Sequence, residues 1–197
     1  LVLGTVKEGA LLEYLVARGV RKGKPEVRSL VIVALANGDK AMLFPTICEI
    51  LADPKENEIV RAGCARALGI MKDARAVNVL IGLDKDKSEL VKVSLVEALL
   101  NFEDDASAQC IASLINDESS WKVRSAAIQA SVLKKNVYSV GYLVMRLRSE
   151  KGRLFGDVLQ ALKDITGVWK GENINAWEQW FKRSEYAKQG KIELTPR

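Results

Sequence analysis

A phrase of ten residues recurs along this chain at a nearly constant spacing. It is clearest at residues 60–69, which read VRAGCARALG. Its opening pair, an apolar residue followed by a basic one, returns at residues 27–28, 91–92 and 123–124. The alanine near its end stands at Ala34, Ala67, Ala98, Ala130 and Ala161, so that successive copies are offset by 33, 31, 32 and 31 residues. Five copies at so regular a period predict an array of stacked repeats.

Each period contains two amphipathic segments separated by a short polar break. In the second copy, Val60, Cys64 and Leu68 fall on one helical stripe, and residues 76–83 carry another. The repeating unit is therefore predicted to be helix, turn, helix. Gly69 is expected to end its helix in the left-handed conformation. One aspartate per repeat is expected to cap the helix that follows the turn, at Asp39, Asp73 and Asp105.

This pattern resembles the HEAT repeat, in particular the short bacterial form of about 31 residues shared with phycobilisome lyase-like proteins. The resemblance covers residues 9–182, and Phe155 replaces the usual arginine in the fifth copy. It implies an all-α, right-handed α-solenoid of about five helical hairpins with a Trp-rich C-terminal cap helix. One solenoid would occupy residues 1–183, followed by a polar tail over 184–197.

The resemblance also places the helices on two sides of the solenoid. The inner, concave helices would lie near residues 26–36, 59–69, 90–100, 122–133 and 154–165, with the cap helix near 174–183. The convex helices would lie near residues 40–52, 74–83, 106–116 and 137–148. The inner helices would then carry a ladder of cations, one per repeat, at Arg28, Arg61, Lys92 and Arg124.

This ladder has two interpretations. It could form a basic rail that binds a ligand. Alternatively, each cation binds the loop carboxylate of its own or an adjacent repeat, through Asp39, Asp73 and Asp105. The structural interpretation is favoured, because one cation per repeat facing one acid per repeat is what stacking geometry needs.

Composition argues against an enzyme. The chain has no histidine, which removes the commonest general base and transition-metal ligand. Zinc hydrolases with histidine ligands, hydrolases with a histidine base and the HEAT-like di-iron hydroxylases, whose sites are built from His and Glu, are therefore not expected. The acidic clusters at residues 103–105 and 84–86 fit solvated turns. No catalytic residue, cofactor, metal site or small-molecule substrate is indicated.

The cysteines and the apolar runs bear on the compartment. Cys48, Cys64 and Cys110 lie on apolar stripes without disulfide or metal spacing, and are predicted to be small buried hydrophobes. Such a set fits a reducing compartment, so the cytoplasm is favoured. No apolar run reaches the roughly 20 residues of a membrane span. The chain begins with Leu1 rather than methionine, as expected of a fragment or a processed product.

Charge is distributed unevenly along the chain. Residues 1–28 carry six basic and three acidic side chains, residues 29–121 nine and fifteen, and residues 122–197 fifteen and seven. The basic C-terminal half could bind nucleic acid, whereas the acidic centre disfavours a continuous phosphate track. A possible anion-binding patch comprises Lys134, Lys135, Arg146, Arg148, Lys151 and Arg153.

The floor of the predicted groove is small and mixed in character. Counted from the ladder positions, it comprises Ser29, Val33, Ala62, Arg66, Val93, Glu97, Ser125, Gln129 and Gln160, with Gly156. Small side chains permit the approach of a partner helix or peptide, and the polar ones could give selectivity. The same stripe could equally be a solvated surface without a partner.

The C-terminal region departs from the repeat. Gly167 is expected to end the fifth inner helix, and Asn175 to cap a helix that carries Trp177, Trp180 and Phe181. This helix is predicted to cover the apolar side of the last repeat; the alternative is a docking site that stacks aromatics on a ligand. Trp121 is expected to pin its loop to the start of the fourth inner helix.

These observations favour a non-catalytic scaffold that binds a partner protein or peptide on its concave inner helices. The first alternative is nucleic-acid binding through the basic C-terminal half. The second is a chromophore lyase-like role, which only the repeat type suggests.

Overall fold

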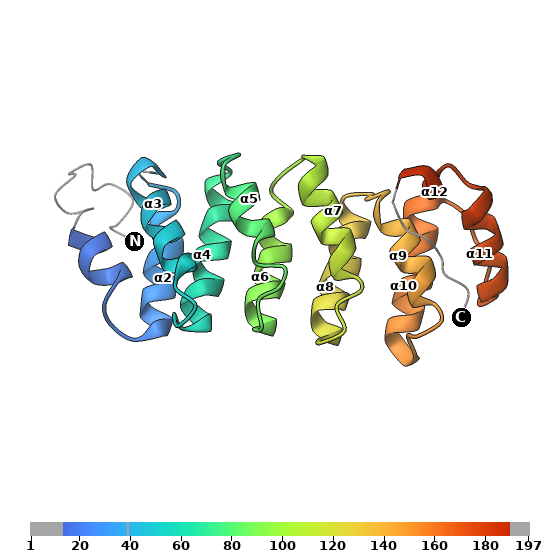
Figure 1. Cartoon of the computed structure of the whole chain (residues 1–197), viewed down its shortest axis with the longest axis horizontal. Coiled ribbons are helices and arrows are strands. Elements are labelled where there is room, and N and C mark those ends of the chain that lie inside the picture. The colour runs from blue at the N-terminus through green and yellow to red at the C-terminus, as the bar shows by residue number, and fades with distance from the viewer. Residues whose placement is uncertain (1–13, 39, 190–197) are drawn as a thin grey trace. The chain divides into compact units, whose positions relative to one another are not determined.

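The computed structural model describes residues 14–38 and 40–189, and its regular elements in those residues are all helices (Figure 1). The chain divides into two compact units, Leu1–Phe102 and Glu103–Arg197, which we call unit 1 and unit 2 and describe separately. The predicted all-α solenoid of helical hairpins is confirmed.

Unit 1 contains three inner helices that pack side by side. Its elements are the π-helix η2 (Leu15–Val20) and the α-helices α2 (Pro25–Leu35), α3 (Lys40–Ala52), α4 (Glu58–Met71), α5 (Ala76–Ile81) and α6 (Glu89–Leu99). Helix α4 contacts α2 on one side and α6 on the other. Helix α3 packs on α4, and α5 packs on α4 and α6 (Figure 1). Helices α2, α4 and α6 carry the repeat phrase with its apolar-basic opening pair, and they are the inner helices of this unit.

Unit 2 repeats the arrangement. Its elements are α7 (Asp105–Leu114), α8 (Trp121–Leu133), α9 (Ser139–Arg146), α10 (Gly152–Thr166), α11 (Ile174–Arg183) and α12 (Tyr186–Gln189). The inner helices α8 and α10 contact each other, while α7 packs on α8 and α9. Helix α9 also contacts α10 and α11. The short α12 lies in the segment predicted to be a polar tail.

From the second copy onward, the closing pair of the repeat phrase is buried in the core, whereas in the first copy Leu35 is buried and Ala34 is exposed. Ala67, Ala98, Ala130 and Ala161 are all buried. The position after each alanine is buried too, even where it is Ser131 rather than leucine, because the Ser131 hydroxyl donates to the Ala127 carbonyl at 2.8 Å. Small side chains at one position and leucine at the next let the helices approach closely without leaving voids.

Gly69 does not end its helix. Helix α4 continues to Met71, and Lys72 takes the left-handed conformation, with φ of 51°. A Cβ built on Gly69 would lie 2.7 Å from the Cα of Ala98 on α6, so the glycine is required by helix packing. Gly63 is a packing glycine as well, because its Cβ would meet Ser29 on α2. Gly167 does end α10 in the left-handed conformation, as predicted.

Two predicted capping residues were wrong by one or two positions. Asp104, not Asp105, caps α7 by accepting from the Ser107 amide at 2.8 Å. Asn173, not Asn175, caps α11 by accepting from the Ala176 amide. Neighbouring polar residues offer equivalent capping oxygens, and the path of the loop decides which one reaches the helix amides. Asp39 lies outside the described residues.

The cysteines and Trp121 differ in part from the expectation. Cys64 and Cys110 are buried, but Cys48 is only half-buried. Burial raises the pKa of the Cys64 thiol to about 12. Trp121 is 61% exposed on the first turn of α8, so it does not pin the loop as predicted. The Ser120 side chain fixes this helix start instead, by accepting from the amides of Lys122 and Val123.

No helix in residues 14–38 and 40–189 is both long enough and apolar enough to cross a lipid bilayer.

The packing role of Gly69 predicts a steep response to one added methyl group. Gly69→Ala is expected to lower the free energy of unfolding by about 1–3 kcal/mol, since its Cβ overlaps the backbone of α6. The matched control is Gly156→Ala in α10, whose Cβ would meet no atom within 4 Å. That variant should gain about 0.5–1 kcal/mol from helix propensity. Urea unfolding followed by circular dichroism measures both, and equal effects would contradict the packing argument.

Candidate functional site

The inner-helix face of unit 1 is the first part of the candidate site. Of the predicted groove residues, Val33, Arg66 and Val93 are half-buried and Glu97 is exposed. Ser29 and Ala62 do not belong to it, because both are buried, Ser29 against Gly63 in the contact between α2 and α4. The prediction placed them on the floor because it treated every inner helix as equally open. In the structure, α4 is covered by a neighbour on each side.

Apolar side chains that the prediction omitted also belong to this face. Ile59 and Ile70 lie seven residues before and four after Arg66 on α4, and both are half-buried. Leu90, seven residues before Glu97 on α6, is 38% exposed. Residues at these spacings share one side of a helix. The helical period could have found them, had it been counted outward from the predicted groove positions.

The inner-helix face of unit 2 is more polar. Ser125 is half-buried, and Gln129 and Gln160 are exposed. Their amides bond along their own helices: Gln129 donates to the Ser125 hydroxyl at 3.3 Å, and Gln160 donates to the Asp164 carboxylate at 2.8 Å. Leu133 on α8 is 75% exposed. This face therefore offers hydrogen-bonding groups together with two exposed apolar side chains of α8, Trp121 and Leu133.

The ladder arginines join consecutive repeats. Each is the fourth residue of its inner helix, and its guanidinium reaches the carboxylate that lies just before the next inner helix. Arg28 forms two hydrogen bonds to Glu56, at 2.6 and 3.0 Å, and Arg61 binds Asp86 at 2.9 Å. In unit 2, Arg124 binds Glu150 at 2.6 Å.

Each of these guanidinium groups also donates to a backbone carbonyl that precedes its own helix, in the loop for Arg61 and Arg124 and at the last residue of η2 for Arg28. Arg28 donates to Val20, Arg61 to Glu56 and Arg124 to Asp117, at 2.7, 3.1 and 2.9 Å. One side chain thus connects three segments: the residues just before its own helix, that helix, and the loop just before the next inner helix. The structural interpretation of the ladder agrees with this geometry. Lys92, at the same position of α6, is also buried.

The carboxylates predicted to pair with the ladder were wrong. Asp73 binds Arg75 two residues away, at 2.6 Å, and lies in the turn inside a hairpin. Asp105 is an exposed residue in the first turn of α7. The true partners stand in the loops between hairpins, because the start of an inner helix lies beside the start of the next inner helix and not beside the turn at its far end.

The predicted anion-binding patch is largely consumed by internal contacts. Arg146 is buried and pairs with Glu150, which therefore accepts from two arginines, and with Glu118 at 2.9 Å. Arg146 was predicted to be a surface charge because it stands in a run of basic residues. In the structure, Arg146 is instead one of the buried residues of α9, where it lies beside Glu150.

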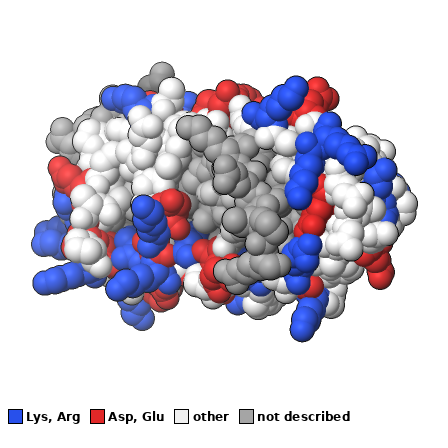
Figure 2. Space-filling view, turned by 45° about the vertical axis from the view of Figure 1, so that its right-hand side comes forward, with Lys and Arg blue, Asp and Glu red and all other residues white. Residues whose placement is uncertain are grey.

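The remaining patch residues vary in availability. Lys134 binds Glu103 at 3.0 Å, Lys135 donates to the Asp164 carbonyl at 2.6 Å, and Arg148 binds Glu178 at 2.5 Å. Lys151 and Arg153 are exposed, with Arg153 at 3.9 Å from Asp157. On the face drawn in Figure 2, Lys and Arg side chains are interspersed with Asp and Glu side chains. Cations separated by anions bind a phosphate backbone less well than an unbroken cationic surface does.

The ladder shifts the titration of its carboxylates. Hydrogen bonds from Arg28 lower the pKa of Glu56 below its ordinary value, against an opposing effect of burial. Burial alone would raise the pKa of Glu150, but the hydrogen bonds and charges of Arg146 and Arg124 outweigh it, so the pKa is lowered. Both carboxylates are therefore ionised at neutral pH, as their ion pairs with arginine require.

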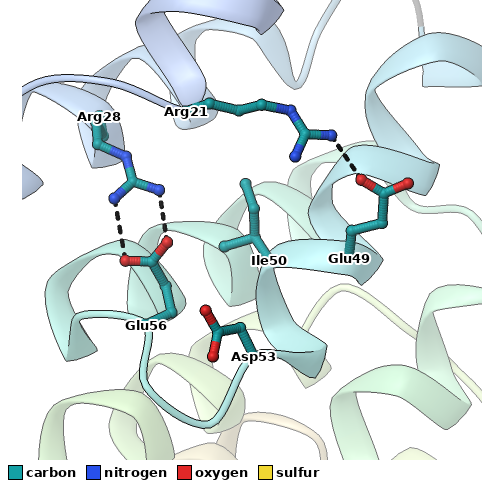
Figure 3. A pocket seen from close by; sticks show the side chains of 6 residues that line it. All are labelled: Arg21, Arg28, Glu49, Ile50, Asp53 and Glu56. Atoms are coloured by element: carbon teal, nitrogen blue, oxygen red, sulfur yellow. Dashed lines mark hydrogen bonds and ion pairs between the residues drawn. The ribbon is translucent and has the colours of Figure 1, made fainter.

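A polar hollow of about 170 Å³ opens beside the first ladder pair. Its lining residues are Arg21, Arg28, Glu49, Ile50, Asp53 and Glu56 (Figure 3). Arg28 faces Glu56 and Arg21 faces Glu49, so most of its charge is already neutralised within the lining (Figure 3). Asp53 accepts from the Lys55 amide at 2.9 Å, as a turn carboxylate does. We assign the hollow to the repeat junction.

The Trp-rich helix α11 packs its aromatic side chains inward, against α9 and the loop that precedes it. Trp177 is fully buried and its indole donates to the Gly171 carbonyl at 2.9 Å, and Phe181 is buried as well. Trp180 stacks edge-on against Trp177, with ring centroids 5.5 Å apart. Helix α11 contacts α9. Trp169, in the preceding loop, is 54% exposed with the Lys163 ammonium 5.8 Å from its ring centroid.

In the part of the chain that the structure describes, no three His, Cys, Asp or Glu side chains are grouped so that they could hold a metal ion.

The chain resembles a known repeat family over much of its length. A family profile described as HEAT repeats matches residues 11–99 and, in a second overlapping placement, residues 54–132. Together these placements span more than half of the chain, and they include the ladder positions of the first four copies.

Among known proteins, deoxyhypusine hydroxylase of Drosophila pseudoobscura pseudoobscura is 33% identical to this chain over 84 residues. The alignment covers 43% of this chain and 28% of the hydroxylase. The chain thus spans well under a third of this relative's length.

The buried ladder pair of unit 2 predicts a large cost for removing its cation. Arg124→Met is expected to lower the free energy of unfolding by about 3 kcal/mol, the lower end for a broken buried pair, because Arg146 still accompanies Glu150. The matched control is Arg148→Met, which breaks the exposed pair with Glu178 and should leave the unfolding midpoint nearly unchanged. Urea unfolding measures both. Similar midpoints for the two variants would contradict a structural role for the ladder.

The lowered pKa of Glu150 predicts an acid-dependent loss of stability. A carboxyl whose pKa is lower in the folded chain than its ordinary 4.5 contributes stability at neutral pH, and this contribution is lost as pH falls through the lowered pKa. Glu150→Gln should therefore be less stable than wild type at neutral pH, with the difference shrinking as the pH falls below 4.5 and through the lowered pKa. Glu172→Gln removes an exposed charge and serves as the control for net charge. A constant difference between Glu150→Gln and wild type would contradict the assignment.

Proposed function

This chain belongs to the HEAT-repeat family, and we propose that it is a non-catalytic scaffold that binds a partner protein or peptide on its inner-helix face. The binding surface would be the exposed side of α2, α4 and α6 within unit 1, and the exposed side of α8 and α10 within unit 2. HEAT repeats commonly mediate protein interactions, and a stacked array presents several such helices to one partner.

The observation that carries this proposal is a contrast on the inner helices between the ladder arginines, which are paired within the fold, and the side chains that remain accessible. The ladder arginines are occupied within the fold by carboxylates and carbonyls. The side chains that remain accessible include the apolar Val33, Leu90 and Val93, with a few polar residues between them. Half-buried apolar side chains flanked by a few polar groups are typical of surfaces that bind polypeptides.

A non-catalytic role agrees with the chemistry that the chain offers. The full sequence has no histidine, and the described residues hold no candidate metal cluster. The hydroxylase is similar over only 28% of its own length. Its activity therefore carries less weight for this chain than the repeat that the two share.

Nucleic-acid binding through the basic C-terminal half receives less support. Four of the six patch residues are engaged with carboxylates or a carbonyl inside unit 2. A chromophore lyase-like role has no observation in its favour.

The proposal predicts that one charge on the inner-helix face abolishes partner binding. Val93→Glu on α6 should reduce capture of partners from a lysate of the source organism at least tenfold, because it places a carboxylate in an apolar contact. Val79→Glu on the outer helix α5, also a half-buried valine, is the matched control and should retain them. Circular dichroism verifies that both variants fold, and quantitative mass spectrometry compares the captured proteins with and without nuclease. Partners lost only with nuclease, or retained by Val93→Glu, would contradict the proposal.

A further inference from the structure

Arg66 is a cation on the inner-helix face of unit 1 that the fold does not use. It is half-buried on α4, between Ile59 and Ile70 on the same side of the helix. It occupies the position that Val33 holds on α2 and Glu97 holds on α6, one repeat earlier and later. Arg66 thus stands in the middle of the three inner helices of this unit.

Arg66 differs from the ladder arginines in its partners. Arg28 and Arg61 each bind a carboxylate and a backbone carbonyl. Arg66 makes a single hydrogen bond, from Nη1 to the Ser94 hydroxyl on α6 at 3.4 Å, and no carboxylate of the described residues lies within ion-pair distance. A guanidinium has five N–H donors in a planar fork that matches a carboxylate. Most of this capacity is therefore open to a ligand.

Arg66 and Glu97 place opposite charges on the inner-helix face of unit 1. Glu97 is exposed and forms no ion pair with any described residue, so the face carries a cation from α4 and an anion on α6. The accessible residues Ile59, Ile70, Leu90 and Val93 of the same face are apolar. The Arg66 guanidinium reaches α6 at Ser94, and Glu97 lies three residues further along that helix, so a ligand meets the cation and the anion about one helical turn apart.

We propose that Arg66 binds a carboxylate side chain, Asp or Glu, of a polypeptide that crosses the inner-helix face of unit 1. The proposal rests on the proposed scaffold function and names the chemistry that its partner carries. Apolar residues beside the partner's acid contact Ile70 and Val93, and Glu97 disfavours a second acid at the next helix. The carboxylate replaces the water that a half-buried guanidinium retains, and such charge-assisted pairs are the stronger hydrogen bonds.

Unit 2 supplies an internal contrast. At the positions equivalent to Arg66 its inner helices carry Gln129 and Gln160, whose amides bond within their own helices. A partner acid is therefore recognised by unit 1 alone. A segment with one acidic residue among apolar ones fits this face better than a polyanion, because one cation beside one anion cannot follow a row of phosphates.

The test uses a displayed library of random 16-residue peptides selected on the full chain, followed by fluorescence anisotropy with the synthetic peptides that are enriched. The expected peptides share one Asp or Glu among apolar residues. Arg66→Gln in the protein and Asp→Asn or Glu→Gln in the peptide should each weaken binding by about 10–100-fold. The two changes together should cost little more than either alone, since both remove the same interaction.

Three further variants separate the outcomes. Arg66→Lys keeps the charge without the fork and should bind at an intermediate level. Arg75→Gln, an exposed arginine paired with Asp73 at the start of α5, should bind as wild type does. Because Arg66 has one weak internal hydrogen bond, Arg66→Gln should melt close to the wild-type temperature, so a loss of affinity reports on the site itself.

Enriched peptides without an acid, or with equal affinity for Arg66→Gln and wild type, would overturn the inference. If those peptides still failed to bind Val93→Glu, the scaffold function would stand and only the carboxylate contact would be wrong. If the peptides bound Val93→Glu as well as wild type, the inner-helix face itself would be excluded. Phosphoserine in place of the acid with tenfold tighter binding would replace the carboxylate by a phosphate.

Discussion

The ion pair between the fourth residue of one inner helix and the loop before the next is the contact on which the array depends. Arg28 with Glu56 and Arg61 with Asp86 hold consecutive hairpins of unit 1, and Arg124 with Glu150 does so in unit 2. Each guanidinium also donates to a backbone carbonyl in the segment that precedes its own helix. The loops carry few apolar side chains that could fix their paths by burial. A half-buried arginine with carboxylate and carbonyl partners supplies that constraint at each junction.

Close approach of the inner helices is the second constraint, and it shapes the candidate site. Gly63 and Gly69 let α4 lie against Ser29 and Ala98 with no room for a side chain. The flanks of α4 are consumed in this way, so only a narrow stripe remains accessible. Arg66 is the polar residue at its centre. The function proposed for the face follows from this separation: cations near the helix starts maintain the fold, and the cation further along the helix is left for a ligand.

Much of the fold could be predicted from the sequence, because helical period and repeat period are both properties of neighbouring residues. Alanine and leucine recurring at a constant offset predicted the inner helices, and Phe155 marked the copy that lacks the ladder arginine. The ladder itself was predicted as structural. The partner acids were not, since Glu56, Asp86 and Glu150 stand in loops whose sequences share no fixed spacing from their arginines. Pairing between segments 25 to 28 residues apart depends on how the hairpins stack.

By itself, then, the sequence determined that this protein is a stack of helical hairpins, where each helix lies and which side of it is apolar. It also showed that these 197 residues contain no histidine. The tertiary structure decided which of the polar residues are spent on the fold. Arg146 proved to be buried beside Glu150, Ser29 and Ala62 to be packing residues, and Arg66 to be accessible. The physical reason is that a side chain's hydrogen-bonding partners come from neighbouring repeats, and only stacking determines which partner lies within reach.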